Sequence, residues 1–183
     1  MARCVRREND IAGLVASLTS AEIATTALLG LHGMGGVGKT MLAADALREV
    51  RVRESYQEGI LWIPVGLNGH KRLHALLRQA ADELHSQRVT RFGSRDPAER
   101  SLDVDGLARW IARRVGQRRV LCVLDDVWEP EVAQAFAPTR MRLLVTTRRS
   151  DVASTAGGKV IGVDTVDDAT ARRMLARAAG LGE

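Results

Sequence analysis

Short, almost continuous apolar runs alternate along the chain with segments whose apolar residues recur at helical spacing. A run that is apolar throughout is typical of a strand buried on both faces, as in a parallel sheet covered by helices on each side. The candidate strands are residues 24–33, 59–66, 120–127, 142–147 and 159–164. The candidate helices are residues 8–18, 38–52, 71–87, 104–115 and 167–180. This alternation predicts an α/β fold with three layers, a five-stranded parallel sheet flanked by helices.

Composition and charge narrow the class of protein only slightly. At 183 residues the chain has room for one ordinary domain. Its formal net charge of +5 comes mostly from scattered arginines, since the only lysines are Lys39, Lys71 and Lys159. Scattered arginine is typical of a solvated basic surface, so we expect that nucleic acid is not the partner.

The two cysteines and the hydropathy profile suggest where the protein acts. Cys4 and Cys122 lack the spacing of metal ligands or of a redox pair, which predicts free thiols in a reducing compartment. No secretory h-region opens the chain, and no apolar run approaches 18 residues. We therefore expect a soluble, cytoplasmic protein with no membrane partner.

A glycine-rich loop carries the clearest chemistry. Residues 33–40, "GMGGVGKT", match the pattern GxxxxGK[ST] without a mismatch, between a predicted strand and a predicted helix. Glycines let backbone N–H groups turn inward around a phosphate, and the positive end of the following helix points at the same anion. Lys39 would reach the β- and γ-phosphates, and the Thr40 hydroxyl would ligate Mg²⁺. The motif predicts a site for the phosphates of a nucleotide.

An acidic pair lies near the end of the third candidate strand. Asp125 and Asp126 come directly after five apolar residues, where carboxylates are costly unless they meet a cation or hydrogen-bond donors. Ligands of open α/β sheets bind beyond the carboxyl ends of the strands, so both side chains would face the phosphate loop. Asp125 is then a water-mediated partner of Mg²⁺, and Asp126 could polarise an attacking water. The alternative is a pair that only caps the turn before residues 129–136.

The fourth apolar run ends in Thr146, Thr147 and Arg148, which would lie at the same edge of the sheet. An arginine there could sense a γ-phosphate and stabilise charge that develops on it. On spacing alone a solvated Arg148 is favoured, and the phosphate sensor is the alternative.

Taken in order, several segments resemble the successive motifs of the NB-ARC family, the P-loop ATPases that form the nucleotide switch of plant disease-resistance receptors and animal apoptosis scaffolds. They are "VRREND", "GMGGVGKT", "GILWIPVG", "RRVLCVLDDVW", "RLLVTTRRSDVA" and the tail "GVDTVDDATARRMLARAAG". The resemblance implies three parts. Residues 1–20 would be an opening segment and helix beside the adenine, 21–166 the P-loop nucleotide-binding domain, and 167–183 the truncated start of the first ARC helical segment.

The resemblance also implies roles for individual residues. Val5 and Arg7 would lie near the adenine. Asp125 and Thr40 would serve Mg²⁺, Asp126 would be the catalytic acid, and Arg148 would be the sensor. The nucleotide would further contact Gly33, Gly35, Gly36, Val37, Gly38, Lys39, Thr40 and Met41.

The function expected from these assignments is the ADP/ATP-binding core of a molecular switch. ADP would hold the resting state, and slow Mg²⁺-dependent hydrolysis of ATP would reset the switch. Self-association and flanking sensor or effector domains would accompany activation. Two alternatives stay open at this point. The chain could be a scaffold fragment that binds nucleotide poorly, or a P-loop kinase of a small acceptor with residues 88–100 as its arginine-rich lid.

Overall fold

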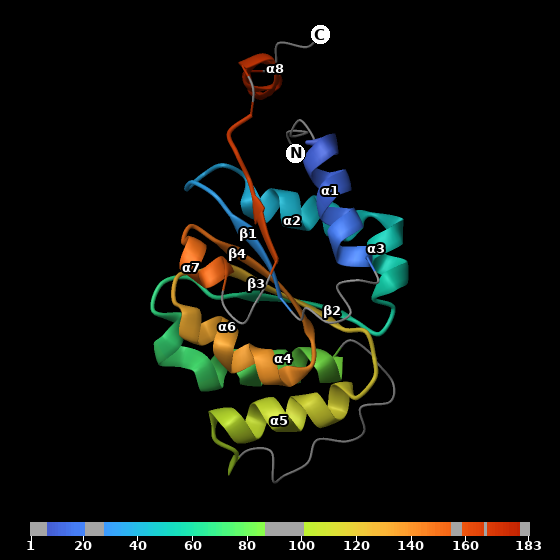
Figure 1. Cartoon of the computed structure of the whole chain (residues 1–183), viewed down its shortest axis with the longest axis vertical. Helices are drawn as coiled ribbons and strands as arrows, with labels where there is room; N and C mark the ends of the chain where they lie inside the picture. Colours follow the sequence, from blue (N-terminus) through green and yellow to red (C-terminus); the bar gives the residue numbers. More distant parts are fainter. Residues whose placement is uncertain (1–6, 21–27, 87–100, 155–158, 167, 180–183) are drawn as a thin grey trace.

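A single parallel sheet forms the centre of the molecule (Figure 1). The computed structural model describes residues 7–20, 28–86, 101–154, 159–166 and 168–179. Within these ranges the strands pair in the order β2-β3-β4-β1-β5, and every pairing is parallel. The strands are β1 Leu28–His32, β2 Ile60–Pro64, β3 Leu121–Val127, β4 Arg142–Thr147 and β5 Lys159–Gly162. The five-stranded parallel sheet expected from the apolar runs is confirmed.

Helices connect the strands. The longer ones are α1 Glu8–Thr19, α2 Lys39–Arg48, α4 Leu73–Ser86, α5 Val104–Val115 and α8 Asp168–Ala178. The six-residue α3, Val50–Ser55, follows α2. Short α6 Pro130–Phe136 and α7 Ser150–Ala153, with 3-10 turns η2 Gly69–Arg72 and η4 Ala137–Thr139, were not predicted. One or two turns display too little of the helical period to be recognised. The single helix expected over 38–52 is wrong, because Glu49 adopts an extended ψ of 133° and separates α2 from α3.

Two hydrophobic cores lie on the two faces of the sheet. Helices α1, α2 and α3 cover one face, and α4, α5 and α6 cover the other (Figure 1). Side chains alternate between these cores along each central strand. On β4, for example, Leu143 and Val145 belong to the core beneath α4–α6, whereas Leu144 belongs to the core beneath α1–α3. The expected three-layer arrangement follows from this alternation.

The edges of the sheet depart from the sequence pattern. The apolar run at 159–164 predicts a strand buried on both faces, but Lys159, Val160 and Gly162 of β5 are exposed. Among the described strands β5 pairs with β1 alone, which makes it an edge strand. Beyond β5 the chain continues to α8, which lies away from the sheet (Figure 1). None of the helices in the described ranges combines the length and the apolar character needed to cross a membrane.

The topology places the functional residues at one edge of the sheet. Because all five strands run parallel, the loops after β1, β3 and β4 leave the sheet at its carboxyl edge. The loop after β1 carries the glycine-rich segment and the loop after β4 carries the arginine, while the acidic pair lies near the end of β3 itself.

Candidate nucleotide-binding site

The loop of residues 33–38 joins β1 to α2 and has a backbone that other residues would strain. Gly36 and Gly38 have φ of 76° and 98°, in the left-handed region that glycine tolerates. A Cβ on Gly33 would lie 2.3 Å from the carbonyl oxygen of Val163, the residue that follows β5. Gly33 thus packs closely against the segment after β5, and the left-handed glycines let the loop turn into the N-terminus of α2.

Lys39, the first residue of α2, lies beneath this loop and is only 8% exposed. Its Nζ donates hydrogen bonds to the carbonyl oxygens of Gly33 at 2.9 Å and Met34 at 2.8 Å. Burial, reinforced by the positive charge of Arg148, lowers the pKa of Lys39. The negative charges of Asp126 and Asp125, near the end of β3, oppose this shift. The ammonium group is therefore held against the loop with its charge only partly compensated, which favours the approach of an anion.

Asp125 is fixed at the same edge by two threonine hydroxyls. Its Oδ1 accepts a hydrogen bond from Thr40 at 2.9 Å and another from Thr146 at 2.6 Å. A hydroxyl and a carboxylate in contact are hard oxygen donors of the kind that Mg²⁺ prefers. No group of three or more histidine, cysteine or acidic side chains able to hold a metal occurs within the described ranges. The pair fits a magnesium ion that takes most of its remaining ligands from phosphates and water.

A β-bulge turns Asp126 toward the site. The register between β3 and β4 shifts between Leu124 and Val127, and Asp126 has a φ of 58°. Its amide donates a hydrogen bond to the Thr146 hydroxyl at 2.8 Å. Neighbouring residues of a regular strand would face opposite sides of the sheet. The bulge instead lets consecutive carboxylates serve the same edge.

Arg148, one residue beyond β4, faces Asp126 across this edge. Its Nε lies 4.0 Å from Asp126 Oδ1, and about half of each side chain is exposed. Its guanidinium carbon lies 5.0 Å from the centroid of the Trp128 ring. On the other side it meets the loop, because a Cβ on Gly35 would lie 2.6 Å from Arg148 Nη1. Arg148 therefore adjoins the phosphate loop and the acidic pair together.

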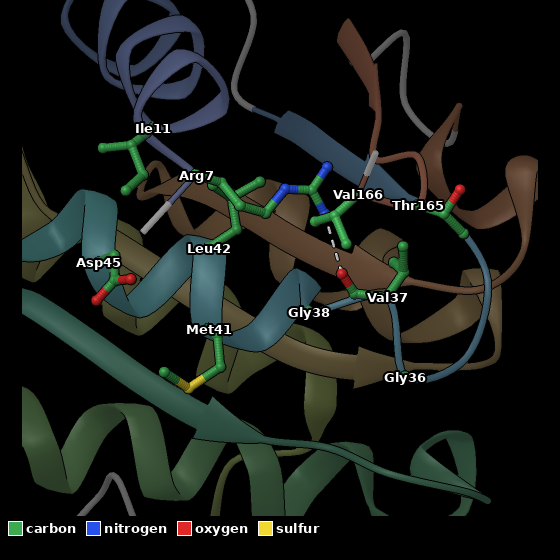
Figure 2. Close-up of a pocket in the computed structure, with 10 residues that line it drawn as sticks. All are labelled: Arg7, Ile11, Gly36, Val37, Gly38, Met41, Leu42, Asp45, Thr165 and Val166. Atoms are coloured by element: carbon green, nitrogen blue, oxygen red, sulfur yellow. Dashed lines mark hydrogen bonds between the residues drawn. The ribbon is translucent and has the colours of Figure 1, made fainter. Parts of the chain in front are cut away.

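A pocket of about 380 Å³ adjoins the loop between α1, α2 and the segment after β5. Figure 2 shows the side chain of Arg7, the residue before α1, reaching across this pocket. Its Nη1 donates a hydrogen bond to the Val37 carbonyl oxygen at 3.0 Å. Nη2 of the same guanidinium donates to the Asp164 carbonyl oxygen at 2.8 Å. The lining residues are Arg7, Ile11, Gly36, Val37, Gly38, Met41, Leu42, Asp45, Thr165 and Val166. Its size and largely apolar lining suit a flat aromatic group next to the phosphate loop.

The residues singled out from the sequence thus fall into two adjoining groups. Arg7, Gly36, Val37, Gly38 and Met41 line the pocket. The carboxyl edge of the sheet and its loops bring together Gly33, Gly35, Lys39, Thr40, Asp125, Asp126 and Arg148. Val5 lies outside the described residues, as do Cys4 and the segment 88–100 that suggested a kinase lid.

Three features of the site were not anticipated from the sequence. The Thr146 hydroxyl links the backbone of Asp126 to the carboxylate of Asp125, a role that the sequence did not indicate although it placed Thr146 at this edge. The Trp128 ring under Arg148 gave no pattern of its own. Thr165 and Val166 complete the pocket from a distant part of the chain, which only the fold reveals.

Comparison with known proteins places these features in a family. The family model described as NB-ARC domain matches residues 7–180. Apoptotic protease-activating factor 1 of Homo sapiens is 32% identical over 129 residues, which are 70% of this chain and 10% of that protein. Probable disease resistance protein RF45 of Arabidopsis thaliana is 26% identical over 161 residues, 80% of this chain and 14% of that protein. The chain spans only a small part of these relatives.

A solved structure shares the fold. It is a Signal Transduction ATPase with Numerous Domains (STAND) protein with a tetratricopeptide repeat sensor, from Pyrococcus horikoshii. The likeness has a TM-score of 0.55 at 15% sequence identity and covers 96% of this chain and 25% of that chain. At this level of identity the likeness concerns the fold alone, and it agrees with the predicted three-layer arrangement around a parallel sheet.

Proposed function

The chain belongs to the NB-ARC domain family of nucleotide-binding signalling NTPases, and we propose that it is the core of a switch controlled by ADP and ATP. The observation that carries the proposal is the joint geometry of the loop, Lys39, Thr40 and Asp125. The Lys39 ammonium lies beneath the glycine-rich loop, and the Thr40 hydroxyl donates a hydrogen bond to the Asp125 carboxylate near the end of β3. A phosphate chain bound there would meet backbone N–H groups, a positive charge and two metal-binding oxygens together.

The adenosine would occupy the pocket beside the loop. Its lining is mainly apolar, and it includes Gly36 and Gly38 of the loop together with Met41 of α2. Arg7 would supply hydrogen-bond donors near the base, and Val5 precedes it in the chain. Adenine is flat and largely apolar with polar edges, which agrees with a pocket of this volume and lining.

Thr40 and Asp125 would hold Mg²⁺, and the ion would neutralise charge between the terminal phosphates. Asp126, turned to the same edge by the bulge, would orient a water for attack on the γ-phosphate. Arg148 would contact the same phosphate and stabilise its charge. Arg148 already faces the Asp126 carboxylate and would compete with a water for it, so we propose slow hydrolysis that resets the switch.

A switch requires that nucleotide binding differ between two conformations, because a ligand shifts an equilibrium only by its differential affinity. Arg7 bonds both the loop, at Val37, and the segment after β5, at Asp164. The pocket wall formed by Thr165 and Val166 leads into α8. We propose that ADP favours this arrangement at rest, and that Mg²⁺–ATP favours one in which α8 moves.

We further propose the division of the chain drawn from its sequence: 1–20 beside the adenine, 21–166 as the nucleotide-binding domain, and 167–183 as the start of the first ARC helical segment. The relatives are far longer proteins. Flanking sensor or effector domains and self-association on activation, in the cytoplasm, belong to the same proposal.

Calorimetric titration of the nucleotide-free protein tests the proposal. We expect the protein to bind ADP. A non-hydrolysable ATP analogue should bind weakly without Mg²⁺ and more tightly with it. Lys39→Ala should abolish most of this binding, while Lys71→Ala, a change at an exposed lysine of η2, should leave it intact. Failure of the wild type to bind either nucleotide would favour the scaffold interpretation. Transfer of phosphate to a small acceptor would favour the kinase.

A further inference from the structure

Arg148 is held by an aromatic ring as well as by charge. Trp128 follows β3 and Arg148 follows β4, which are neighbouring strands, so both residues leave the carboxyl edge of the sheet side by side. The guanidinium carbon lies 5.0 Å from the centroid of the indole. This is within the distance at which a cation is attracted to the face of an aromatic ring, and tryptophan attracts it most strongly.

The remaining neighbours of the guanidinium differ in kind. The ion pair with Asp126 is loose, with 4.0 Å between Nε and Oδ1, and both side chains are about half exposed. On the loop side Nη1 occupies the space beside Gly35 that a side chain would otherwise fill. The ring therefore supports the guanidinium, while one edge faces a carboxylate and another faces the phosphate loop. A phosphate arriving at the loop would compete with Asp126 for the same cation.

The burial of Trp128 indicates that its ring does more than fill space. The residue is half-buried, and its indole Nε1 is buried without a hydrogen-bond partner in the described part of the chain. Buried indole N–H groups usually have an acceptor, because burial without one is unfavourable. A leucine would pack at this position without this cost. The indole offers in return the aromatic face that contacts Arg148.

We propose that Trp128 is a positioning residue that holds the Arg148 guanidinium over Gly35, and so sets how strongly the site prefers a nucleoside triphosphate to a diphosphate. An unsupported arginine of this exposure would sample many rotamers and lose that freedom on binding. Stacking on Trp128 restricts the guanidinium before the ligand arrives, so binding costs less conformational entropy. In the proposed placement of the nucleotide the γ-phosphate is the group that would reach the held guanidinium, so the effect falls on the triphosphate. This inference rests on the proposed function.

Two substitutions separate stacking from packing. Trp128→Leu keeps an apolar side chain but removes the aromatic face, whereas Trp128→Phe keeps a face. Each variant is titrated by calorimetry with ADP, and with Mg²⁺ and a non-hydrolysable ATP analogue. We expect Trp128→Leu to weaken binding of the analogue by about 10-fold and Trp128→Phe by less than about 3-fold. Binding of ADP should stay within about 2-fold in both variants. The melting temperature of each variant checks that it is folded.

A double-mutant cycle links the effect to the arginine. Arg148→Ala should weaken binding of the analogue at least as much as Trp128→Leu, and the combined variant should lose no more than Arg148→Ala alone. If Trp128→Leu and Trp128→Phe both keep the wild-type ratio of the two affinities, the positioning role is overturned while the proposed function stands. Absence of nucleotide binding by the wild type would overturn both.

Discussion

Replacing Thr146 by valine removes the hydroxyl that organises the acidic pair and changes the shape of the side chain little. Thr146 is 1% exposed. Its Oγ1 accepts a hydrogen bond from the Asp126 amide at 2.8 Å and donates one to Asp125 Oδ1 at 2.6 Å. The substitution therefore leaves a backbone donor without its partner and removes one of the two hydroxyls that support the carboxylate.

The expected loss of stability follows from these two bonds. An amide left without a partner in a half-buried position costs about 1–2 kcal/mol, and the lost bond to a charged acceptor adds about 1 kcal/mol. The second contribution is small because Asp125 is partly exposed and still accepts a bond from Thr40. We expect Thr146→Val to lower the free energy of unfolding by about 2–3 kcal/mol. With a urea m-value of about 2 kcal/mol/M, the unfolding midpoint falls by about 1–1.5 M.

Thr147→Val is the matched control, because Thr147 is the next residue on β4 and is also fully buried. Its hydroxyl accepts a hydrogen bond from the Arg149 amide at 3.0 Å and donates a long one, 3.5 Å, to the Arg149 carbonyl oxygen. Because Arg149 is exposed, water can replace both bonds, so we expect a loss below about 1 kcal/mol. Urea denaturation of the wild type and both variants, followed by circular dichroism, gives the comparison. Equal losses in the two variants would refute the role assigned to Thr146 in holding the acidic pair.

Three further predictions concern the pocket and the cores. Gly33→Ala places a Cβ 2.3 Å from a backbone carbonyl and should cost about 2 kcal/mol or more, whereas Gly162→Ala, with open space around it, should change the urea midpoint little. Arg7→Ala removes two bonds to backbone carbonyls as well as the ion pair with Asp10, and should cost about 1–3 kcal/mol. Arg48→Ala removes only an exposed ion pair and should cost less than about 0.5 kcal/mol; equal costs would contradict the bridging role of Arg7. Burial raises the pKa of the Cys122 thiol, so the folded state keeps the proton that the unfolded state loses above about pH 8.5. Stability should then fall by about 1.4 kcal/mol per pH unit beyond that point, and Cys122→Val, compared in urea at pH 8 and 10, should lack this contribution.

Local sequence patterns predicted the elements whose signals are local. The apolar runs predicted every strand of the sheet, and the motif of residues 33–40 predicted a glycine-rich loop between a strand and a helix. The break at Glu49 was missed because the apolar period continues from α2 into α3. The exposure of β5 was missed because apolar content does not distinguish a central strand from an edge strand.

The finer arrangement of the site depends on contacts that no local pattern encodes. The adjacency of Asp125 and Asp126 suggested a shared edge, but the bulge that makes both reach it appears only in the pairing of β3 with β4. Trp128 and Arg148 are twenty residues apart, and they meet because their strands are neighbours. Val166 lies far along the chain from the pocket residues of α1 and α2, and only the fold brings it beside them.

The most direct test of the account is a thermal denaturation series with ADP, comparing the wild type with Lys39→Ala and Lys71→Ala. At 100 times its dissociation constant, ADP should stabilise the wild type by about 2.7 kcal/mol, which raises the melting temperature by about 5–10 °C. We expect the same rise for Lys71→Ala and none for Lys39→Ala at equal ADP. A rise of equal size in Lys39→Ala, or no rise in the wild type, would contradict the assignment of the loop of residues 33–38 as the phosphate-binding site.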